Sequence, residues 1–201
     1  MTKGERTRLK LLDAAEKLFA SKGYSNTSLR DIAANAGIQE PGIYNHFKGK
    51  DALYSEVLNR ALQPLADAIE ATIVNGAPEK DLVTLPAKLT DLLADHPAMP
   101  ALFHQALIGS PDDTGHTVIT HWLAKLFAHG ENMWAQISPE NRVDKQRITL
   151  RMILMFNAVT GYFLSQKLLN GAGAGDMLSP ENLAEQKRLL AKVMQLFILE
   201  L

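Results

Sequence analysis

One short stretch of the chain, residues 27 to 50, has residue types and spacing that fit the recognition of nucleic acid. It reads TSLRDIAANAGIQEPGIYNHFKGK. Within it Ala33, Gly37 and Ile43 stand four and six residues apart, the spacing of a helix-turn-helix. The motif needs a small residue where two helices touch, a glycine free to adopt positive φ in the turn, and an apolar anchor for the second helix. The chemistry that it offers is hydrogen bonding and ion pairing to DNA through that second helix.

The rest of the chain lacks the residue patterns of common catalytic and metal sites. Its cysteine count is 0, which excludes disulfides, thiolate metal sites and a cysteine nucleophile. GxSxG, HExxH and phosphate-cradling glycine loops are missing. No two of the histidines after residue 50 have the i, i+3 or i, i+4 spacing that places two imidazoles on one helical face. We therefore expect no enzyme, no metal site and no cofactor.

Helical periodicity predicts the elements that position the motif. A first amphipathic helix carries apolar residues at i, i+1, i+4, i+7 and i+8 from Leu11, and Lys22 and Gly23 end it. A second begins at Thr27 or Ser28 and ends at Gly37. The third is expected from about residues 39–41 to residue 46, barely two turns.

The remainder is also expected to be helical. A long helix follows residue 50 and is kinked at Pro64. Further helices are expected at about 79–95, 98–109, 116–137, 140–170 and 180–200, with breaks at Gly and Pro clusters. The GAGAG segment at 171–175 is expected to be a flexible connection between the last two helices. With no strand pattern, the fold class is all-α, with one domain at 1–50 and a second at 51–201.

Charge separates these two domains. The formal net charge is −1, yet residues 1–50 hold nine Lys or Arg against five acids, and residues 51–201 hold twelve against seventeen. A basic module on a neutral-to-acidic body fits phosphate binding by the first part alone. The polar start MTKGERTRLK has no signal-peptide core, and no apolar run approaches the length of a membrane span. We expect a cytoplasmic protein without membrane contact.

Residues 9 to 60 resemble the DNA-binding region of the TetR/AcrR family of bacterial transcriptional regulators. The resemblance rests on an ordered set of residues at the family's spacing: Phe19, Gly23, Thr27, Ile32, Ala33, Gly37, Ile38, Tyr44, His46, Phe47, Lys50 and Leu53. It implies a three-helix helix-turn-helix domain that a long helix joins to a helical ligand-binding and dimerisation domain.

The resemblance also implies which residues contact DNA. The DNA-facing residues would be Gln39, Glu40, Gly42, Tyr44, Asn45 and His46. The phosphate contacts would be Thr27, Ser28 and Lys50. Gln39 and Gly42 replace residues more usual in the family, so base recognition would depend on Gln39, Glu40 and Asn45. Amide side chains can pair with adenine, and a carboxylate can accept from cytosine.

Other residues of this region have two interpretations. Phe47 is expected in the core, and Tyr44 either in the core or against a phosphate. The basic residues near the start are either a solvated end or an arm that contacts DNA, and these are Lys3, Arg6, Arg8 and Lys10.

Aromatic residues in the helical body indicate a pocket for an apolar or aromatic ligand. The candidate lining residues are Phe103, His104, Trp122, Trp134, Phe156, Asn157 and Tyr162. Among them His104, Asn157 and Tyr162 can orient a ligand through hydrogen bonds. Each residue taken alone could equally be ordinary core.

The last two expected helices have broad apolar faces, which predict a homodimer through a four-helix bundle. One face comprises Ile148, Met152, Met155, Val159 and Phe163, and the other Leu183, Leu190, Val193, Leu196 and Phe197. Burial of these faces within their own domain is the alternative.

Together these patterns predict a ligand-responsive transcriptional regulator, a repressor that a small apolar or aromatic effector releases from a pseudo-palindromic DNA operator. The alternative is a helix-turn-helix co-regulator that acts through a protein partner without an effector. A body without any internal cavity would favour that alternative. An enzyme would need ionisable residues converging in the cavity, which the spacing does not provide.

Overall fold

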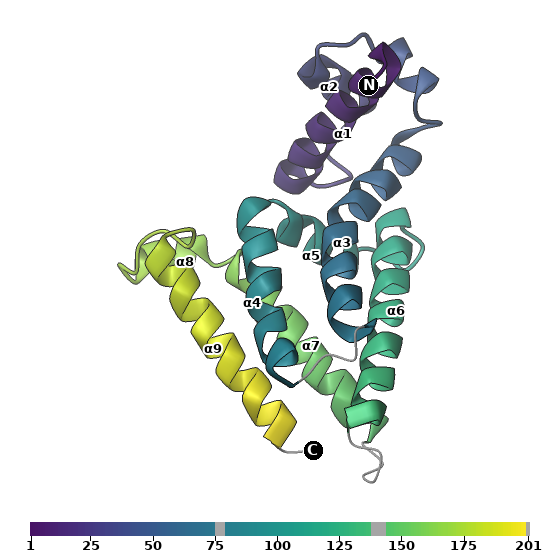
Figure 1. The fold of residues 1–201 in the computed structure, drawn as a ribbon. Coiled ribbons are helices and arrows are strands. Elements are labelled where there is room, and N and C mark those ends of the chain that lie inside the picture. The colour runs from purple at the N-terminus through teal and green to yellow at the C-terminus, as the bar shows by residue number, and fades with distance from the viewer. Residues whose placement is uncertain (75–78, 138–143, 200–201) are drawn as a thin grey trace. The chain divides into compact units, whose positions relative to one another are not determined.

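The computed structural model describes residues 1–74, 79–137 and 144–199, with side chains left out of the description at 73, 74, 79, 80 and 132–137. In these ranges every regular element is a helix (Figure 1). The elements are α1 (Lys3–Lys22), α2 (Leu29–Ala36), the 3-10 helix η1 (Glu40–Asn45), α3 (Lys50–Val74), α4 (Glu79–Asp95), α5 (Met99–Ile108), α6 (Thr114–Ile137), α7 (Lys145–Tyr162), α8 (Gln166–Gly171) and α9 (Pro180–Leu199). None of these described helices is both long and apolar enough to cross a membrane. The expectation of an all-α fold is confirmed.

The chain forms two compact units, each made of two segments. The first unit combines Met1–Leu62 with Ala101–His121, and the second combines Gln63–Pro100 with Trp122–Leu201. Two long helices, α3 and α6, therefore each belong partly to one unit and partly to the other.

The core of the first unit is built around Phe19 of α1. Phe19 is fully buried, and its ring lies 4.8 Å from the ring of Tyr54 and 5.9 Å from that of Tyr24. Leu11, Leu12 and Ala15 are buried on the same helix face, as the apolar spacing predicts. The helix ends at Lys22, because Gly23 adopts φ +81° and breaks the helical path.

The segment after α2 differs from the expected short α-helix. Between residues 40 and 45 the chain makes a 3-10 helix with i to i+3 hydrogen bonds, Gly42 N to Gln39 O and His46 N to Ile43 O, both 2.8 Å. Pro41 has no amide hydrogen to donate to a helical partner, and short segments often adopt the tighter 3-10 form. The predicted position of this element is correct, and its predicted helix type is wrong.

Ion pairs fasten α3 to α1 within the first unit. The guanidinium of Arg60 lies 2.8 Å from Asp13 and 2.6 Å from Glu16, and Arg8 pairs with Glu56. Although burial alone would lower the pKa of Arg60, its hydrogen bonds to Glu16 and Asp13 raise it. Four residues after Arg60, Pro64 lies inside α3 and leaves the carbonyl of Arg60 without its helical partner. The expected kink at Pro64 stays a prediction.

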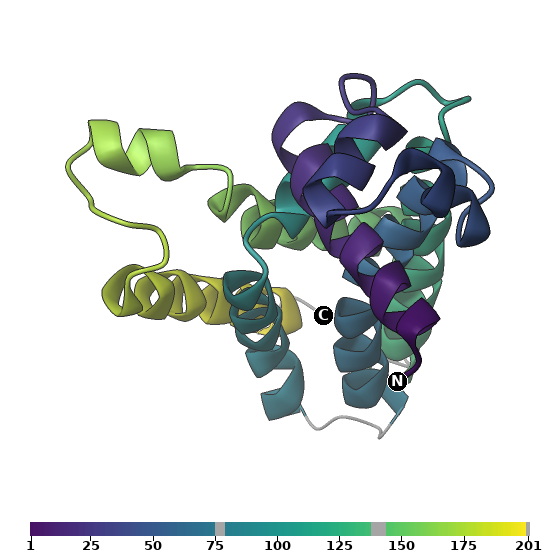
Figure 2. The ribbon, with the colours of Figure 1, turned by 90° about the horizontal axis from the view of Figure 1, so that it is seen from above.

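In the second unit α4 and α9 lie side by side, and α7 packs against both (Figures 1 and 2). Leu82, Leu93 and Leu190 are buried between these helices or in the adjoining core. Gln186 of α9 donates to the carbonyl of Ala158 on α7 at 2.9 Å, and Lys187 pairs with Asp91 of α4 at 2.8 Å. Apolar burial thus holds the three helices together, and polar contacts fix their register.

The single helix expected over 140–170 is wrong. Residues 145–171 form α7 and α8, separated at residues 163–165. There the amides of residues 163–165 each donate to the carbonyl three residues earlier. The hydroxyl of Ser165 donates to the carbonyl of Gly161 at 2.9 Å. This hydroxyl takes the carbonyl to which the amide of residue 165 would donate in a continuing α-helix, so it satisfies that carbonyl where α7 ends. Residues 140–143 of the expected range lie outside the described part.

Candidate nucleic-acid interface and ligand cavity

The turn between α2 and η1 has the geometry that the motif requires. Gly37 adopts φ +68°, a conformation that favours glycine, and the amide of Ile38 donates to the carbonyl of Ala33 at 2.9 Å. Ala33 and Ile43 are 2% and 0% exposed. The small contact residue, the turn glycine and the apolar anchor therefore take their expected places.

The segment of residues 39–46, called here the DNA-facing segment, presents most of its polar side chains to solvent. Gln39, Glu40 and Asn45 are exposed, and Tyr44 is 58% exposed. Gly42 and His46 are half-buried. The structure thus gathers all six expected DNA-facing residues on one short element, and it removes the core interpretation of Tyr44. Phe47 is buried, as expected.

Thr27 does not present its side chain to a phosphate. It is only 1% exposed, and its hydroxyl donates to the carbonyls of Gly23 at 2.8 Å and Leu18 at 3.3 Å. The hydroxyl closes the turn that follows α1, so its role is to hold that turn. The expectation of a phosphate contact from this side chain is wrong in this structure.

Ser28 lies at the surface, but its polar groups already have partners. It caps α2: its hydroxyl accepts from the amide of Asp31 at 3.1 Å, while its own amide and hydroxyl donate to the Asp31 carboxylate at 3.2 and 2.7 Å. These hydrogen bonds lower the pKa of Asp31, which places a negative charge at the start of α2. A phosphate would have to displace that carboxylate to reach Ser28.

Lys50 begins α3 beside a network that was not expected from the sequence. Its ammonium lies 4.1 Å from the centre of the Tyr24 ring. The hydroxyl of Tyr24 donates to Asp51, and the hydroxyl of Thr114 donates to the same oxygen at 3.0 Å. Burial, together with the hydrogen bond to Asp51, raises the pKa of Tyr24. Lys50 is half-buried at the position where a phosphate contact was expected.

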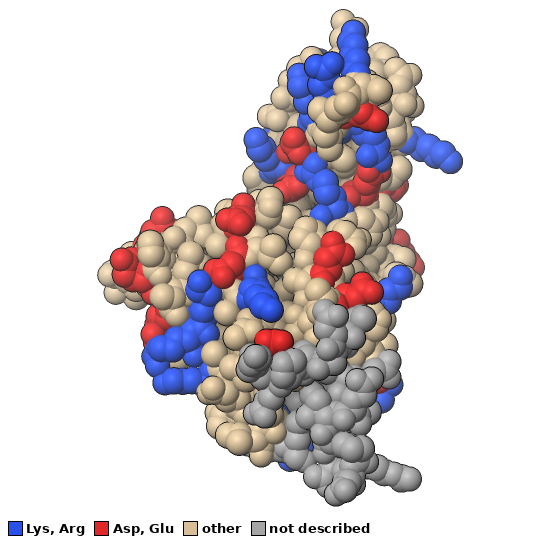
Figure 3. Space-filling view, viewed as in Figure 1, with Lys and Arg blue, Asp and Glu red and all other residues tan. Residues whose placement is uncertain are grey.

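Basic side chains surround this part of the first unit. The exposed ones before residue 50 are Lys3, Arg6, Lys10, Lys17, Lys22, Arg30 and Lys48. Figure 3 shows Lys and Arg side chains gathered over the face of α1 and α2. Arg8 is set apart, because it pairs with Glu56 and stacks over Phe47, 5.2 Å from the ring centre. A polyanion would meet a net positive surface here.

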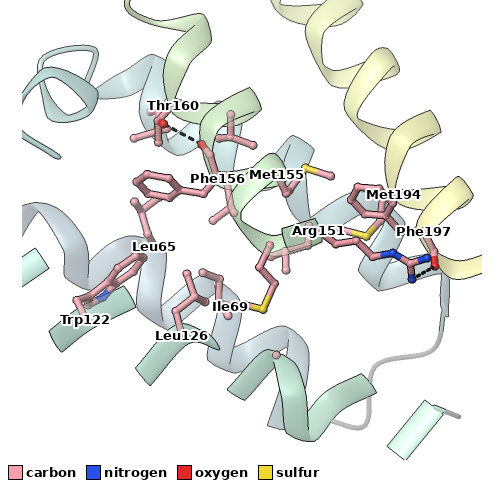
Figure 4. Close-up of a pocket in the computed structure, with 16 residues that line it drawn as sticks. Leu65, Ile69, Trp122, Leu126, Arg151, Met155, Phe156, Thr160, Met194 and Phe197 are labelled. Atoms are coloured by element: carbon pink, nitrogen blue, oxygen red, sulfur yellow. Dashed lines mark hydrogen bonds between the residues drawn. The ribbon is translucent and has the colours of Figure 1, made fainter. Parts of the chain in front are cut away.

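The second unit contains an apolar cavity of about 120 Å³ (Figure 4). Its lining residues are Leu65, Ile69, Leu85, Leu89, Leu93, Trp122, Leu126, Gly130, Arg151, Met152, Met155, Phe156, Val159, Thr160, Met194 and Phe197. They come from α3, α4, α6, α7 and α9. A cavity of this size, close to one that holds a benzene molecule, suits a small apolar group.

Only part of the expected ligand set lies at this cavity. Trp122 and Phe156 line it. Phe103 is fully buried on α5 of the first unit, and His104 lies beside it, where burial lowers its pKa. Asn157 is exposed, and its amide donates to the carbonyl of Ile153 at 2.9 Å. None of these three lines the cavity, and their expected contact with a ligand stays a prediction.

Tyr162 holds a loop in place and does not lie at the cavity. The hydroxyl of Tyr162 donates to the carbonyl of Met177 at 2.7 Å, which ties α7 to the loop before α9. Burial, followed by the charge of Asp176, raises its pKa. Trp134 falls on α6 at a position whose side chain is outside the described part of the structure.

Arg151 and Thr160 are the polar side chains at the cavity, and sequence reasoning missed both. Arg151 donates to the carbonyl of Phe197 at 3.0 Å and stacks 5.4 Å from its ring centre, so it caps the end of α9 (Figure 4). Thr160 is buried and donates to the carbonyl of Phe156 at 2.8 Å. The helical spacing of Met152, Met155, Phe156 and Val159 was a usable signal.

The two apolar faces that were expected to form the dimer contact are mostly buried within the chain, so most of that prediction is wrong. Ile148, Met155, Val159, Phe163 and Leu190 are buried within the chain. Met152 and Phe197 line the cavity, and Leu183 and Val193 are half-buried. Leu196, which is 57% exposed, is the one residue of the two predicted faces that lies open at the surface. The exposed apolar residues of α7 are Leu150, Ile153 and Leu154.

The described residues contain no group of three histidines or acids placed to hold a metal ion.

Comparisons with known proteins agree with the turn geometry. Residues 11–57 match the family model described as bacterial regulatory proteins, tetR family. The transcriptional repressor KstR2 of Rhodococcus jostii (strain RHA1) is 31% identical over 130 residues, which cover 63% of this chain and 61% of KstR2. The regulator AcrR of Shigella flexneri is 47% identical over 53 residues, which cover 26% of this chain and 25% of AcrR. The chain thus spans less than two thirds of each of these relatives.

Solved structures share the fold over nearly the whole chain. The fatty acid degradation regulator FadR of Bacillus halodurans aligns with a TM-score of 0.70 at 17% identity, covering 94% of this chain and 96% of that one. FadR of Bacillus subtilis, solved with stearoyl-CoA, aligns with a TM-score of 0.68 at 18% identity, covering 91% and 97%. The turn geometry, the family match and the sequence relatives therefore agree that residues 11–57 form a helix-turn-helix domain similar to that of the bacterial regulatory proteins of the tetR family.

Proposed function

We propose that the protein is a ligand-responsive transcriptional repressor that binds a pseudo-palindromic operator as a homodimer. Residues 1–50 contact the DNA, and residues 51–201 supply the effector site and the dimer contacts. One observation carries the proposal: an exposed polar DNA-facing segment and a separate apolar cavity occur in one chain. Relatives named as repressors, KstR2 among them, support the sign of regulation.

The geometry of the DNA-facing segment supports a division of labour. Gln39, Glu40 and Asn45 carry exposed amide and carboxylate groups that can pair with base edges. Lys50 and the exposed Tyr44 are placed to contact phosphates, which fix register without specifying sequence. Thr27 is not among the proposed phosphate contacts, because its side chain is buried. Ser28 can contact a phosphate only if the Asp31 carboxylate moves aside.

The cavity supports an apolar effector. Its lining contains one charged residue, Arg151, whose guanidinium already caps α9. A volume of about 120 Å³ admits a benzene-sized group or a short alkyl chain, and a long acyl chain would require it to expand. The stearoyl-CoA complex of the structurally similar FadR makes acyl compounds worth testing beside aromatic ones. The cavity also disfavours the alternative of a co-regulator without effector, which a body lacking any cavity would have supported.

Exposed leucines support a homodimer through the last helices. Leu150, Ile153 and Leu154 lie exposed on α7, and Leu189, Leu196 and Leu199 lie exposed on α9. Exposed apolar residues in such number on two helices indicate a protein interface, and a two-fold axis would pair these helices with their copies. Leu154→Glu should shift the species seen in sedimentation towards monomer. The matched change Ile108→Glu, at an 83% exposed site of the first unit, should not. A dimer that survives Leu154→Glu would place the interface elsewhere.

We propose that the effector acts through α3. Two DNA-facing segments of a dimer fit successive major grooves when they lie about 34 Å apart, so a change of a few ångströms at their separation releases one of them. Pro64 removes one hydrogen bond from α3, which makes a pivot there inexpensive. An effector that favours the released form must bind more weakly when operator is present, by about 1 to 3 kcal/mol.

The decisive experiment has two stages. Selection of bound fragments from genomic DNA should yield an inverted repeat. Acyl and aromatic compounds are then titrated by tryptophan fluorescence with and without that repeat. Equal affinities in the two titrations would leave the cavity as a binding site and refute its control of DNA release. Failure to enrich any DNA would refute the DNA-binding function itself.

A further inference from the structure

The wall of the cavity contains a glycine in the interior of a long helix. Gly130 is buried in α6 and lines the cavity. Glycine is disfavoured inside helices relative to alanine, so a glycine in this position calls for a packing reason. The neighbour of Gly130 supplies such a reason.

Met152 of α7 occupies the space beside Gly130. A Cβ added to Gly130 would lie 2.5 Å from the sulfur of Met152 and 2.6 Å from its terminal methyl group. Such distances are too short for two atoms in contact, so any side chain at residue 130 requires Met152 to move. The atoms in question are the far end of an unbranched side chain with three rotatable bonds, so the backbone can stay in place.

Met152 itself lines the cavity, so its conformation sets the space that an effector can fill. While the thioether rests against the backbone of Gly130, it is held at the α6 side. If that space is filled, the end of Met152 must turn elsewhere, and the adjacent unfilled volume is the cavity. The closely packed interior around it leaves few other positions.

We propose that Gly130 and Met152 act together to set the largest apolar group that the effector site accepts. This inference rests on the proposed effector cavity and adds a size limit to it. Gly130→Ala should reduce the limit by driving Met152 into the cavity. Met152→Ala should raise it by removing three side-chain atoms from the wall.

Straight-chain primary alcohols from butanol to decanol provide a neutral probe series that does not involve the charge of Arg151. Each buried methylene should tighten binding about fourfold until the cavity is filled, after which the gain stops. Binding is measured by calorimetry, and by the fluorescence of Trp122 in a Trp134→Phe background. The chain length at which the gain stops should be shorter in Gly130→Ala and longer in Met152→Ala than in the parent protein.

The pair is tested by a double-mutant cycle. Gly130→Ala should change the limiting length in the parent but not in the Met152→Ala background, because the side chain that it displaces is gone. Met194→Ala is the matched control, since Met194 lines the same cavity from α9, whereas the three atoms nearest to a Cβ added at Gly130 all belong to Met152. In that background Gly130→Ala should keep its effect. Gly161→Ala controls for helix propensity, because an added Cβ there meets no atom within 4 Å.

The outcomes separate this inference from the proposal on which it rests. If the parent protein binds no alcohol of the series, the effector cavity is refuted. If the parent shows a limiting length that neither variant changes, or if the Gly130→Ala effect persists in Met152→Ala, the inference is refuted and the cavity stands. Circular dichroism verifies folding. Should Gly130→Ala not fold, Met152→Ala alone must still bind the longest alcohols at least fourfold more tightly than the parent.

Discussion

The first unit turns its candidate functional side chains outward, whereas the second turns them inward around a partly open cavity. Asn45 and Tyr44 are exposed on a short element whose position depends on local hydrogen bonds, such as those of the turn at Gly37. The cavity wall instead draws on five helices, with residues from Leu65 to Phe197. A local sequence therefore suffices to build the surface that we propose for DNA. A site for a small apolar molecule depends on how distant segments pack.

The same contrast predicts different costs for removing an aromatic ring. Phe19→Ala should destabilise the protein by about 3 to 5 kcal/mol, because Phe19 is fully buried against two other rings. Phe156→Ala should destabilise it less, because part of the Phe156 surface already faces empty space. Urea unfolding measures both. Equal losses would show that the cavity wall is packed as tightly as the core of the first unit.

In the first unit, single exposed side chains should control which DNA sequence is bound. Asn45→Ala and Gln39→Ala should each cost about 1 to 3 kcal/mol at particular base pairs, because an exposed amide can form two hydrogen bonds with one base. Binding isotherms on matched and single-base-changed operators measure the loss. An equal loss on every sequence would move these residues into the phosphate-contact set.

Lys50→Ala should weaken binding to all sequences by a similar factor and lower the salt slope by roughly one ion. The control is Lys167→Ala, an exposed lysine of α8 in the second unit, which should leave DNA binding unchanged. A change of base preference in Lys50→Ala would contradict the assignment.

The smallest expected effect is a pH dependence that belongs to the first unit. Burial, together with the charge of Asp113, raises the pKa of Tyr54 to about 12 from its ordinary 10. Since the folded state holds this proton more tightly, stability from Tyr54 is fully present below pH 10 and is lost as the pH rises towards 12. Tyr54→Phe should flatten the dependence of unfolding free energy on pH across that interval. An unchanged slope would mean that Tyr54 ionises as it does in the unfolded chain.

The elements that local signals define could be predicted from the sequence. Gly23 and Gly37 end α1 and α2 where expected, and Ser28 caps α2. The helix limits near residues 95 and 108 also agree with the breaks expected at His96-Pro97 and Ser110-Pro111, whereas the break expected at Ser138-Pro139 lies outside the described residues. In each case the bonds that determine the structure join residues fewer than about five positions apart.

The residues that sequence reasoning misplaced depend on tertiary contacts. Thr27 is a polar residue before a helix, and only its bonds to Gly23 and Leu18 show that it points inward. Phe103 is as aromatic as Phe156, yet the two lie in different units. An apolar stripe such as that of α7 has one face for the cavity and another for solvent, and periodicity gives their spacing without saying which is which.

The discontinuity of the first unit limits how this protein can evolve or be engineered by recombination. Residues 101–121 belong to the same compact unit as residues 1–62, and Thr114 and Tyr24 share one oxygen of Asp51. A crossover near residue 50 would graft a foreign helix-turn-helix onto the native α5 and start of α6, and it would break up that three-residue network. Successful chimeras should therefore exchange both segments together, even though the two stand about forty residues apart in the gene.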